Sequence, residues 1–359
     1  MMGESVATED PSVETEHRLA LYRAMVLSRE FETEAERQYK AAKIGGYCHL
    51  SSGQEATTVG TVTALEEDDY LVTGYRCHGF ALARGVSADS AMAELFGRQD
   101  GCAHGRGGSM HLLDVERHFY GGWGIVAGQL PIATGLALGI VRQDRSQAVL
   151  CELGEGAVNM GAWHESLNLA SLWKLPVVFL AVNNEYGMGT AVDRASAEPE
   201  VFRRASAHRM HGERVDGNDL DAVVEAATRL LTLAREEREP AVLEAVTYRY
   251  RGHSVADAGL AYRTKDEIAE WSGNRDPIEL ERSRLLEAGV AAGEIEAIED
   301  DAREEVKRAV EFAEASPEPA LDGLARGMHA PGSEAQFAGM RAGSPFGEET
   351  LTFDAGLGS

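Results

Sequence analysis

The stretch Ala148-Val-Leu-Cys-Glu-Leu-Gly-Glu-Gly156 and the later stretch Pro176-Val-Val-Phe-Leu-Ala-Val-Asn-Asn184 decide the fold. Each contains a short, largely apolar run that predicts a buried strand, and the runs end at glycines and at two asparagines. Residues 159–173, between them, are predicted to form a helix. Strand, helix and strand in this order form a βαβ unit, with parallel strands and a right-handed crossover. The sequence therefore predicts an α/β fold with a parallel sheet flanked by helices on both faces.

The rest of the chain supplies further elements around this unit. Apolar spacing predicts helices at 17–43, 219–236 and 277–315 and strands at 70–74 and 241–248. The first helical segment is expected to pack on the core as an N-terminal helical arm. Glycine-rich or aperiodic composition predicts loops at 101–108 and 249–263, the longer one resembling a lid. We expect one α/β domain over residues 17–330, with a flexible N-terminus at 1–16 and a flexible tail at 331–359.

Composition narrows the class of protein. The net charge of -25 argues against nucleic acid or an anionic membrane as a general partner. The apolar run 177–182 is too short to cross a bilayer, and the acidic start of the chain is unlike a secretory or organelle signal. The four cysteines form no C-x-x-C pair, so reduced thiols and a cytoplasmic location are expected.

Polar residues follow both central strands where ligands bind in parallel sheets. Glu155 lies between two glycines after the first strand, and Asn184 follows the second. Because the carboxyl ends of parallel strands meet at one sheet edge, both side chains can converge there on a phosphate-bound magnesium ion. Asn159 and the start of the helix near it are expected to add amide donors for an anion. Taken singly, the glycines are also compatible with an ordinary turn and the asparagines with a left-handed turn.

These two stretches resemble a known motif. Gly154-Glu-Gly-Ala-Val-Asn-Met-Gly161 and Asn183-Asn-Glu-Tyr-Gly-Met-Gly-Thr190 are similar to the thiamine diphosphate motif of 2-oxoacid dehydrogenase α subunits. Further matches are Tyr47-Cys-His-Leu50, Gly53-Gln-Glu55, Tyr75-Arg-Cys-His-Gly79, Gly107-Gly-Ser-Met-His111, Tyr120-Gly-Gly-Trp-Gly-Ile-Val126 and Tyr250-Arg-Gly-His-Ser254. Tyr186-Gly-Met-Gly-Thr190 and Tyr262-Arg-Thr-Lys265 are most like the pyruvate and acetoin dehydrogenase branch.

The resemblance implies a thiamine diphosphate-binding fold and a role for each matching residue. Magnesium would be ligated by Glu155, Asn184 and the Tyr186 carbonyl, and the diphosphate would be held by Tyr75, Arg76 and His253. The aminopyrimidine would contact Gly124 and Val126, and the phosphate loop would contain Gly156 and Ala157. His49 and His253 are the candidate catalytic residues, as proton donors or anion binders, although His49 is also compatible with a packing role.

The implied activity needs a second chain. In this family the glutamate beside the pyrimidine ring lies on a β subunit, so the resemblance implies an α2β2 assembly that decarboxylates a 2-oxoacid, pyruvate first. The acyl group would then pass to a lipoyl group on a transacylase. Two alternatives stay open at this point: a scaffold subunit that binds its partner without the cofactor, and an enzyme that uses another acyl or ketol donor.

Glu155 departs from the family's usual aspartate. Glutamate keeps the charge but adds one methylene, whereas magnesium tolerates little deviation from octahedral distances of about 2.1 Å. The longer side chain must therefore retract or bind through water. We expect retained cofactor binding with weaker or altered metal preference.

Overall fold

The computed structural model describes residues 11–321 of the 359-residue chain. The chain divides into two units, residues 1–318 and 319–359, and the first is described here by itself. Of the N-terminus expected to be flexible, residues 11–16 belong to the first helix, and the predicted tail 331–359 lies outside the described residues.

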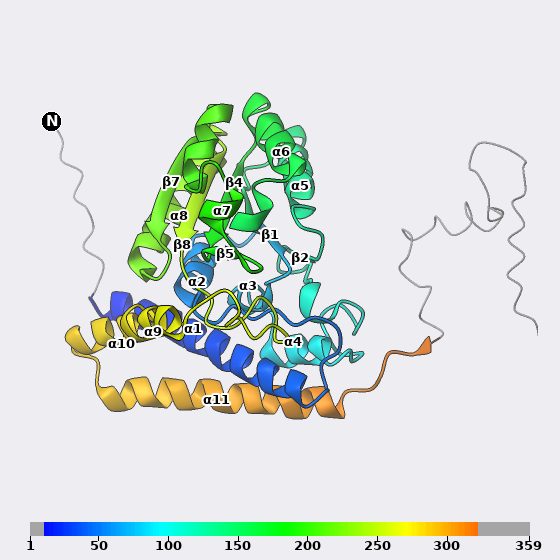
Figure 1. Ribbon diagram of the computed structural model, residues 1–359, viewed down its shortest axis with the longest axis vertical. Coiled ribbons are helices and arrows are strands. Elements are labelled where there is room, and N and C mark those ends of the chain that lie inside the picture. The colour runs from blue at the N-terminus through cyan, green and yellow to red at the C-terminus, as the bar shows by residue number, and fades with distance from the viewer. Residues whose placement is uncertain (1–10, 322–359) are drawn as a thin grey trace, which may run out of the picture. The chain divides into compact units, whose positions relative to one another are not determined.

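A six-stranded sheet forms the centre of the first unit (Figure 1). Its order is β2 (Phe119–Trp123), β1 (Tyr70–Gly74), β3 (Val149–Gly154), β4 (Val177–Asn183), β8 (Ala241–Val246) and β7 (His211–Asp216), and every neighbouring pair is parallel. Helix α6 (Gly161–Leu172) connects β3 to β4, as the central βαβ unit predicts. The α/β fold with a parallel sheet is thus confirmed.

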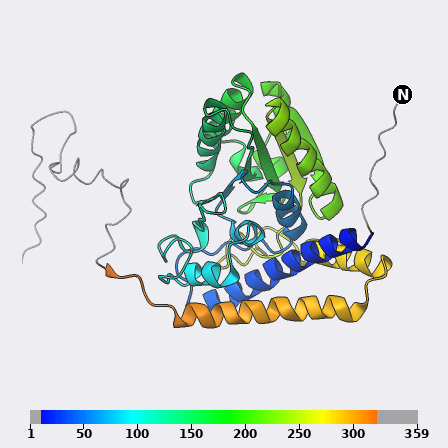
Figure 2. The same ribbon diagram turned by 180° about the vertical axis from the view of Figure 1, so that it is seen from behind.

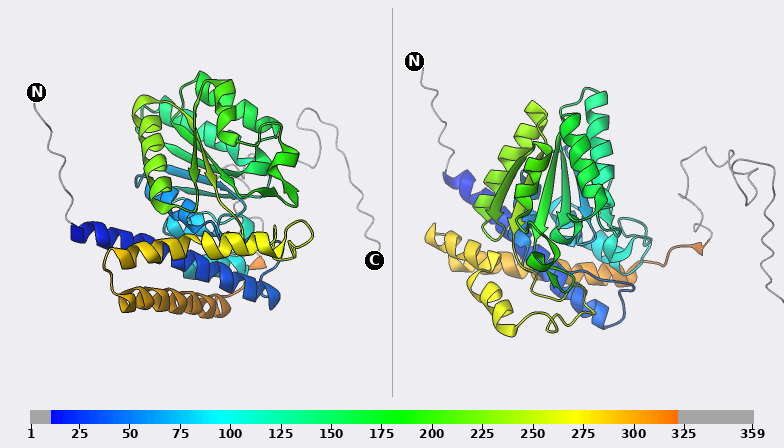
Figure 3. Two further views of the ribbon diagram at one scale, coloured as in Figure 1. Left: turned by 60° about the vertical axis from the view of Figure 1, so that its left-hand side comes forward. Right: turned by 45° about the horizontal axis from the view of Figure 1, so that its top comes forward.

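Side chains of the central strands alternate between two apolar layers. On β4, Val178, Leu180 and Val182 face one layer, whereas Val177, Phe179 and Ala181 face the other. The first layer contains residues of α2 (Glu55–Thr63), α3 (His78–Ala83) and α8 (Leu220–Glu237), and the second contains residues of α5 (Gln129–Arg142), α6 and η3 (Val201–His208). Figure 3 shows the sheet edge-on between these helices. Burial on both faces explains why these strands are continuous apolar runs.

The N-terminal helical arm is one long helix, α1 (Pro11–Lys40). It crosses α11 (Ala292–Ala315) and also contacts α2, α3 and α10 (Pro277–Glu287) (Figure 2). Ion pairs fix the crossing, including Arg23 with Asp301 at 2.6 Å. The predicted helix 277–315 is divided into α10 and α11, because Gly289 adopts a left-handed φ of 91°.

Several elements were not predicted. They are α2, α3, α4 (Ala88–Leu95), α5, α7 (Val192–Ala195), α9 (Lys265–Asn274), β2, β7 and a two-stranded hairpin of β5 (Tyr186–Gly187) and β6 (Thr190–Ala191), with the 3₁₀ segments η1 (Gly108–Met110), η2 (Glu155–Ala157) and η3. The sequence of β7, His-Gly-Glu-Arg-Val-Asp, lacks an apolar run because β7 is an edge strand with partly exposed side chains. No helix among residues 11–321 is long and apolar enough to cross a membrane.

Candidate active site

A pocket of about 370 Å³ opens at the carboxyl ends of the central strands. Its lining includes most of the predicted site residues: Tyr75, Arg76, Val126, Glu155, Gly156, Ala157, Asn184, Tyr186 and His253. They come from the segments that follow β1, β2, β3, β4 and β8. Gly124 and His49 are absent from the lining. The strand order therefore gathers motifs that are up to 178 positions apart in the sequence, from Tyr75 to His253.

Glu155 lies in the turn η2 directly after β3 and is 3% exposed. Its carboxylate accepts a hydrogen bond from the Asn184 backbone N–H at 3.3 Å, which places it against the next loop. Burial raises the pKa of Glu155. Hydrogen bonds from its own backbone N–H and from that of Asn184, together with the charges of Arg249 and Arg76, oppose this rise. A buried carboxylate is costly to ionise, and a bound cation would offset that cost.

The loop after β4 presents oxygen atoms beside Glu155. Asn184 Oδ1 and the Tyr186 carbonyl each accept a hydrogen bond from the Arg249 guanidinium at 3.3 Å. Glu185, with φ 71°, turns the chain there, so the left-handed residue is neither of the two asparagines. A Cβ on Gly156 would lie 3.5 Å from Gly187 Cα, an ordinary contact distance, so the loops after β3 and β4 lie next to each other here. Carboxylate, amide and carbonyl oxygens of this kind are suited to magnesium.

Arg249 is a site residue that the sequence analysis missed. Its side chain is fully buried, and its closest acceptor is the Met188 carbonyl at 2.5 Å. A solitary arginine after a strand is usually a surface residue, so only its position beyond β8 at the same sheet edge hints at this role. The structure thus already places a positive charge against two of the predicted metal ligands.

Arg76, Tyr75 and two histidines form one cluster at the pocket wall. Arg76 donates to the Leu50 carbonyl at 2.5 Å and to the His253 carbonyl at 3.0 Å. The ring of His49 lies 4.4 Å from that of Tyr75 and 5.0 Å from that of His253, between centroids. Burial, together with nearby Arg76, lowers the pKa of His49 to about 3 and that of His253 to about 4. Both imidazoles are therefore neutral near pH 7, and His49 Nδ1 is buried without a hydrogen-bond partner among the described residues.

The remaining wall follows β2. A Cβ on Gly124 would lie 3.0 Å from His111 Cε1, so this glycine packs against His111 behind the pocket surface. Val126 lines the pocket and is 44% exposed, and Ile125 beside it is 75% exposed. This side of the pocket is apolar and open.

Loop 249–263 is held by internal hydrogen bonds. Asp257 accepts from the His253 N–H at 2.7 Å, the Tyr262 hydroxyl at 2.5 Å and the Gly259 N–H at 2.9 Å. Arg263 donates to the carbonyls of Arg249 and Arg251. The predicted loop is confirmed, and its hydrogen bonds hold Arg249 against the loop after β4 and His253 at the pocket.

The predicted start of the helix at Asn159 is wrong. Helix α6 begins at Gly161, so Asn159 lies outside it. Its amide donates to the Ala195 carbonyl and its oxygen accepts from Arg204, so its side chain ties loops together at the pocket rim. Three buried polar residues that line the same pocket were also missed: Gln54, which caps the start of α2, Gln129 of α5 and Glu152 of β3.

Comparison with known proteins places this site in a family. The family model described as "Dehydrogenase E1 component" matches residues 23–322. The chain belongs to the dehydrogenase E1 component family. It is 44% identical over 310 residues to the pyruvate dehydrogenase E1 component subunit alpha of Rhizobium meliloti, covering 86% of this chain and 89% of that protein. It is 42% identical over 334 residues to the somatic, mitochondrial form of the same subunit from Homo sapiens, covering 92% and 84%.

The family assignment confirms the resemblance to α subunits of thiamine diphosphate-dependent 2-oxoacid dehydrogenases. Members of the E1 dehydrogenase family use thiamine diphosphate. The roles of the individual site residues stay predictions.

Proposed function

We propose that this chain is the α subunit of a pyruvate dehydrogenase E1 component that holds thiamine diphosphate and Mg²⁺ in the pocket beyond β3 and β4. The observation that carries the proposal is the gathering of the diphosphate and metal motifs around one pocket at the carboxyl edge of the sheet. The names of the relatives, pyruvate dehydrogenase E1 component subunit alpha, support the substrate.

The residues present fit the cofactor. Buried Glu155 makes no ion pair within residues 15–321, and it lies beside the Asn184 and Tyr186 oxygens that face a guanidinium. Arg76 and the His253 imidazole lie at the pocket, where they would hold the diphosphate. Gly156 leaves room for a phosphate to approach the backbone N–H groups of the turn.

Thiamine diphosphate supplies the electron sink for decarboxylation of a 2-oxoacid. This chain's part is to bind and orient: Glu155, Asn184 and Tyr186 would hold the cation, and Tyr75 would line the diphosphate site. The neutral imidazoles of His49 and His253 would hold hydrogen bonds rather than a charge. A β subunit would complete the site in an α2β2 assembly, and a lipoyl group on a transacylase would accept the acyl group. The acidic chain is expected to work in the cytoplasm.

The test is to co-express the chain with its β partner and measure reduction of an artificial electron acceptor across a panel of 2-oxoacids. Pyruvate is expected to give the highest kcat/KM. Arg76→Ala should raise the KM for thiamine diphosphate, while the exposed Glu165→Ala should leave it unchanged. Cofactor binding without turnover of any 2-oxoacid would favour another donor, and absence of binding would favour a scaffold subunit. The scaffold alternative is the less favoured, because the predicted cofactor residues are still gathered at one pocket.

A further inference from the structure

The pocket contains a second buried acid, Glu152, to which the proposed reaction gives no role. Glu152 lies on β3, three positions before Glu155, and is 5% exposed. Leu150 belongs to the apolar layer of α2 and α3, and strand alternation turns Glu152 toward the same face of the sheet. Its carboxylate reaches the inner wall of the cofactor pocket.

The partners of Glu152 are few. One carboxylate oxygen accepts a hydrogen bond from the Gly74 N–H at 2.7 Å, at the end of β1 and directly before Tyr75 and Arg76. Within residues 15–321 no arginine, lysine or histidine forms an ion pair with it. A buried carboxylate with one neutral donor is costly to ionise.

The environment of Glu152 in the pocket raises the free-energy cost of ionising it. Burial first, and then the charge of Glu155, raise the pKa of Glu152 to about 7, against the Gly74 hydrogen bond and the charge of Arg76. Gln54 and Gln129 line the same pocket, and each keeps one buried amide atom without a partner among the described residues. The pocket thus has unmet hydrogen-bonding capacity and a carboxyl group whose pKa lies near neutrality.

We propose that Glu152 takes up a proton when thiamine diphosphate and its cation enter the pocket, so that cofactor binding is coupled to protonation of this carboxyl group. The inference rests on the proposed function. Three effects of cofactor binding favour the protonated form of Glu152. An ionised diphosphate has more negative charge than one divalent cation cancels. The diphosphate also engages Arg76 and displaces water from Glu152. Protonated Glu152 can still accept the Gly74 hydrogen bond, so the end of β1 keeps its place.

The other titratable groups around Glu152 do not change charge in the same way. Tyr75 and Arg76 follow β1, Cys77 caps α3, and Cys151 precedes Glu152 on β3. The rings of His49 and His253 lie 4.4 Å and 5.9 Å from the Tyr75 ring, between centroids. Burial raises the pKa of Tyr75, Cys77 and Cys151, and holds that of both histidines at about 3 and 4. Glu155 would bind the cation. Because burial raises its pKa too, a variant at Glu152 is needed to distinguish the proton uptake of the two acids.

The experiment is calorimetric titration of the full chain, co-expressed with its β partner, with thiamine diphosphate and Mg²⁺ between pH 6 and pH 8.5. Buffers of different ionisation enthalpy give the number of protons taken up. Wild type is expected to take up about half a proton more per site at pH 7 than Glu152→Gln, which mimics the protonated acid, and nearly one more at pH 8. From pH 7 to 8.5 the wild-type affinity should fall about tenfold relative to this variant.

Glu165→Gln is the matched control, an exposed acid on α6, and it should behave as wild type. Equal proton uptake in wild type and Glu152→Gln, with both binding the cofactor, would overturn the inference. Failure of wild type to bind would instead overturn the proposed function. If Glu152→Gln does not fold, infrared difference spectra of the wild type provide the test. Cofactor binding should produce the C=O band of a protonated carboxylic acid. Absence of this band would overturn the proposed coupling.

Discussion

Glu155 is the predicted cation ligand whose fit matters most for the proposed function. Its side chain is one methylene longer than an aspartate, and its carboxylate is buried and accepts a hydrogen bond from the Asn184 N–H. Ordering this longer side chain costs conformational freedom that a shorter acid would not lose.

Glu155→Asp should bind thiamine diphosphate with Mg²⁺ roughly three- to tenfold more tightly, because the shorter side chain reaches octahedral distances without retraction. The measurement is calorimetry on the complex with the β subunit. Weaker binding by the aspartate variant would mean that the loops are built around glutamate.

Arg249, the first residue of loop 249–263, joins this loop to the loop that follows β4. Its guanidinium donates to carbonyls on both sides, at Met188 and Arg251, and its side chain is fully buried. Arg249→Met would keep the volume but leave these buried acceptors unpaired. We expect the free energy of unfolding to fall by about 2 to 4 kcal/mol and the KM for thiamine diphosphate to rise.

Urea denaturation and steady-state kinetics measure the two effects of Arg249→Met. The nearby Arg251 is exposed, and Arg251→Met should change stability by less than about 0.5 kcal/mol. An Arg249 variant as stable as that control would contradict the role assigned to the buried guanidinium.

At the scale of elements, loop 101–108 shows how one buried acid orders a glycine-rich segment. Glu94 on α4 is fully buried and accepts hydrogen bonds from the backbone N–H groups of Ala103, Gly105, Gly107 and Gly108. A Cβ on Gly107 would lie 2.4 Å from the His111 carbonyl, so the ordered loop packs directly on the segment behind Gly124. Glu94 thereby supports the pocket wall from a distance.

Glu94→Gln should lower the free energy of unfolding by about 2 to 4 kcal/mol, because one carboxylate oxygen and the negative charge are lost from four N–H donors. The readout is urea denaturation, with exposed Glu116→Gln as the control. Equal stability of the two variants would show that the loop orders itself without the charge.

Loop 249–263 depends on a carboxylate. Although burial raises the pKa of Asp257, hydrogen bonds from Tyr262, His253 N–H and Gly259 N–H outweigh it and lower the pKa to about 2. Because its pKa is lowered, the ionised Asp257 carboxylate stabilises the folded loop at pH values above its ordinary pKa of 3.8. This stabilisation is lost as the pH falls toward 2.

Loop 249–263 should therefore become sensitive to an acid-active protease as the pH falls from about 4 to 2. Asp257→Asn should show enhanced cleavage in this loop already at pH 7, measured by mass spectrometry of trypsin fragments ending at Arg251. Cleavage of the variant no faster than that of wild type would disprove the role of the carboxylate.

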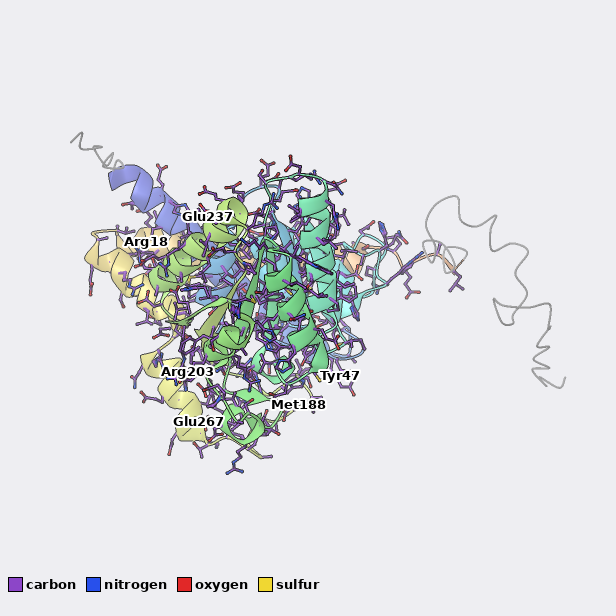
Figure 4. The ribbon with its side chains drawn as sticks, turned by 90° about the horizontal axis from the view of Figure 1, so that it is seen from above. Arg18, Tyr47, Met188, Arg203, Glu237 and Glu267 are labelled. Carbon is purple, nitrogen blue, oxygen red and sulfur yellow. The ribbon has the colours of Figure 1, made fainter. Side chains whose placement is uncertain are left out.

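At the scale of the whole molecule, apolar side chains surround the open side of the pocket. Ile125 and Met188 are strongly exposed, and Figure 4 places Met188 on the same side of the unit as Glu267 of α9. The Tyr186 hydroxyl donates to Glu267 at 2.9 Å, so this rim is built from the hairpin and α9 together. An exposed apolar rim around an open cofactor site is suited to contact with a partner chain.

Ile125→Asp should abolish co-purification with the β subunit, because it buries a charge in the proposed contact. Thermal unfolding of the full chain by itself should be unchanged, since Ile125 is already in solvent. Leu286→Asp, on an exposed position of α10, is the control and should still co-purify. Retained co-purification by the Ile125 variant would place the partner elsewhere.

The sequence by itself determined the fold class, the central βαβ unit and the cofactor motif. Apolar runs such as 177–182 predict buried strands because both faces of a parallel sheet are covered. These are local consequences of composition and spacing. The edge strand β7 and the short helices have no such pattern, and were missed.

Only the tertiary structure decided which side chains share the pocket. The burial of Arg249, the contact of Glu155 with the Asn184 N–H and the position of His49 beside Tyr75 depend on contacts between segments far apart in the chain. The near-neutral pKa of Glu152 likewise arises chiefly from burial, which depends on how distant segments pack around it. Desolvation and long-range Coulomb interactions act through space, so spacing along the chain does not encode them.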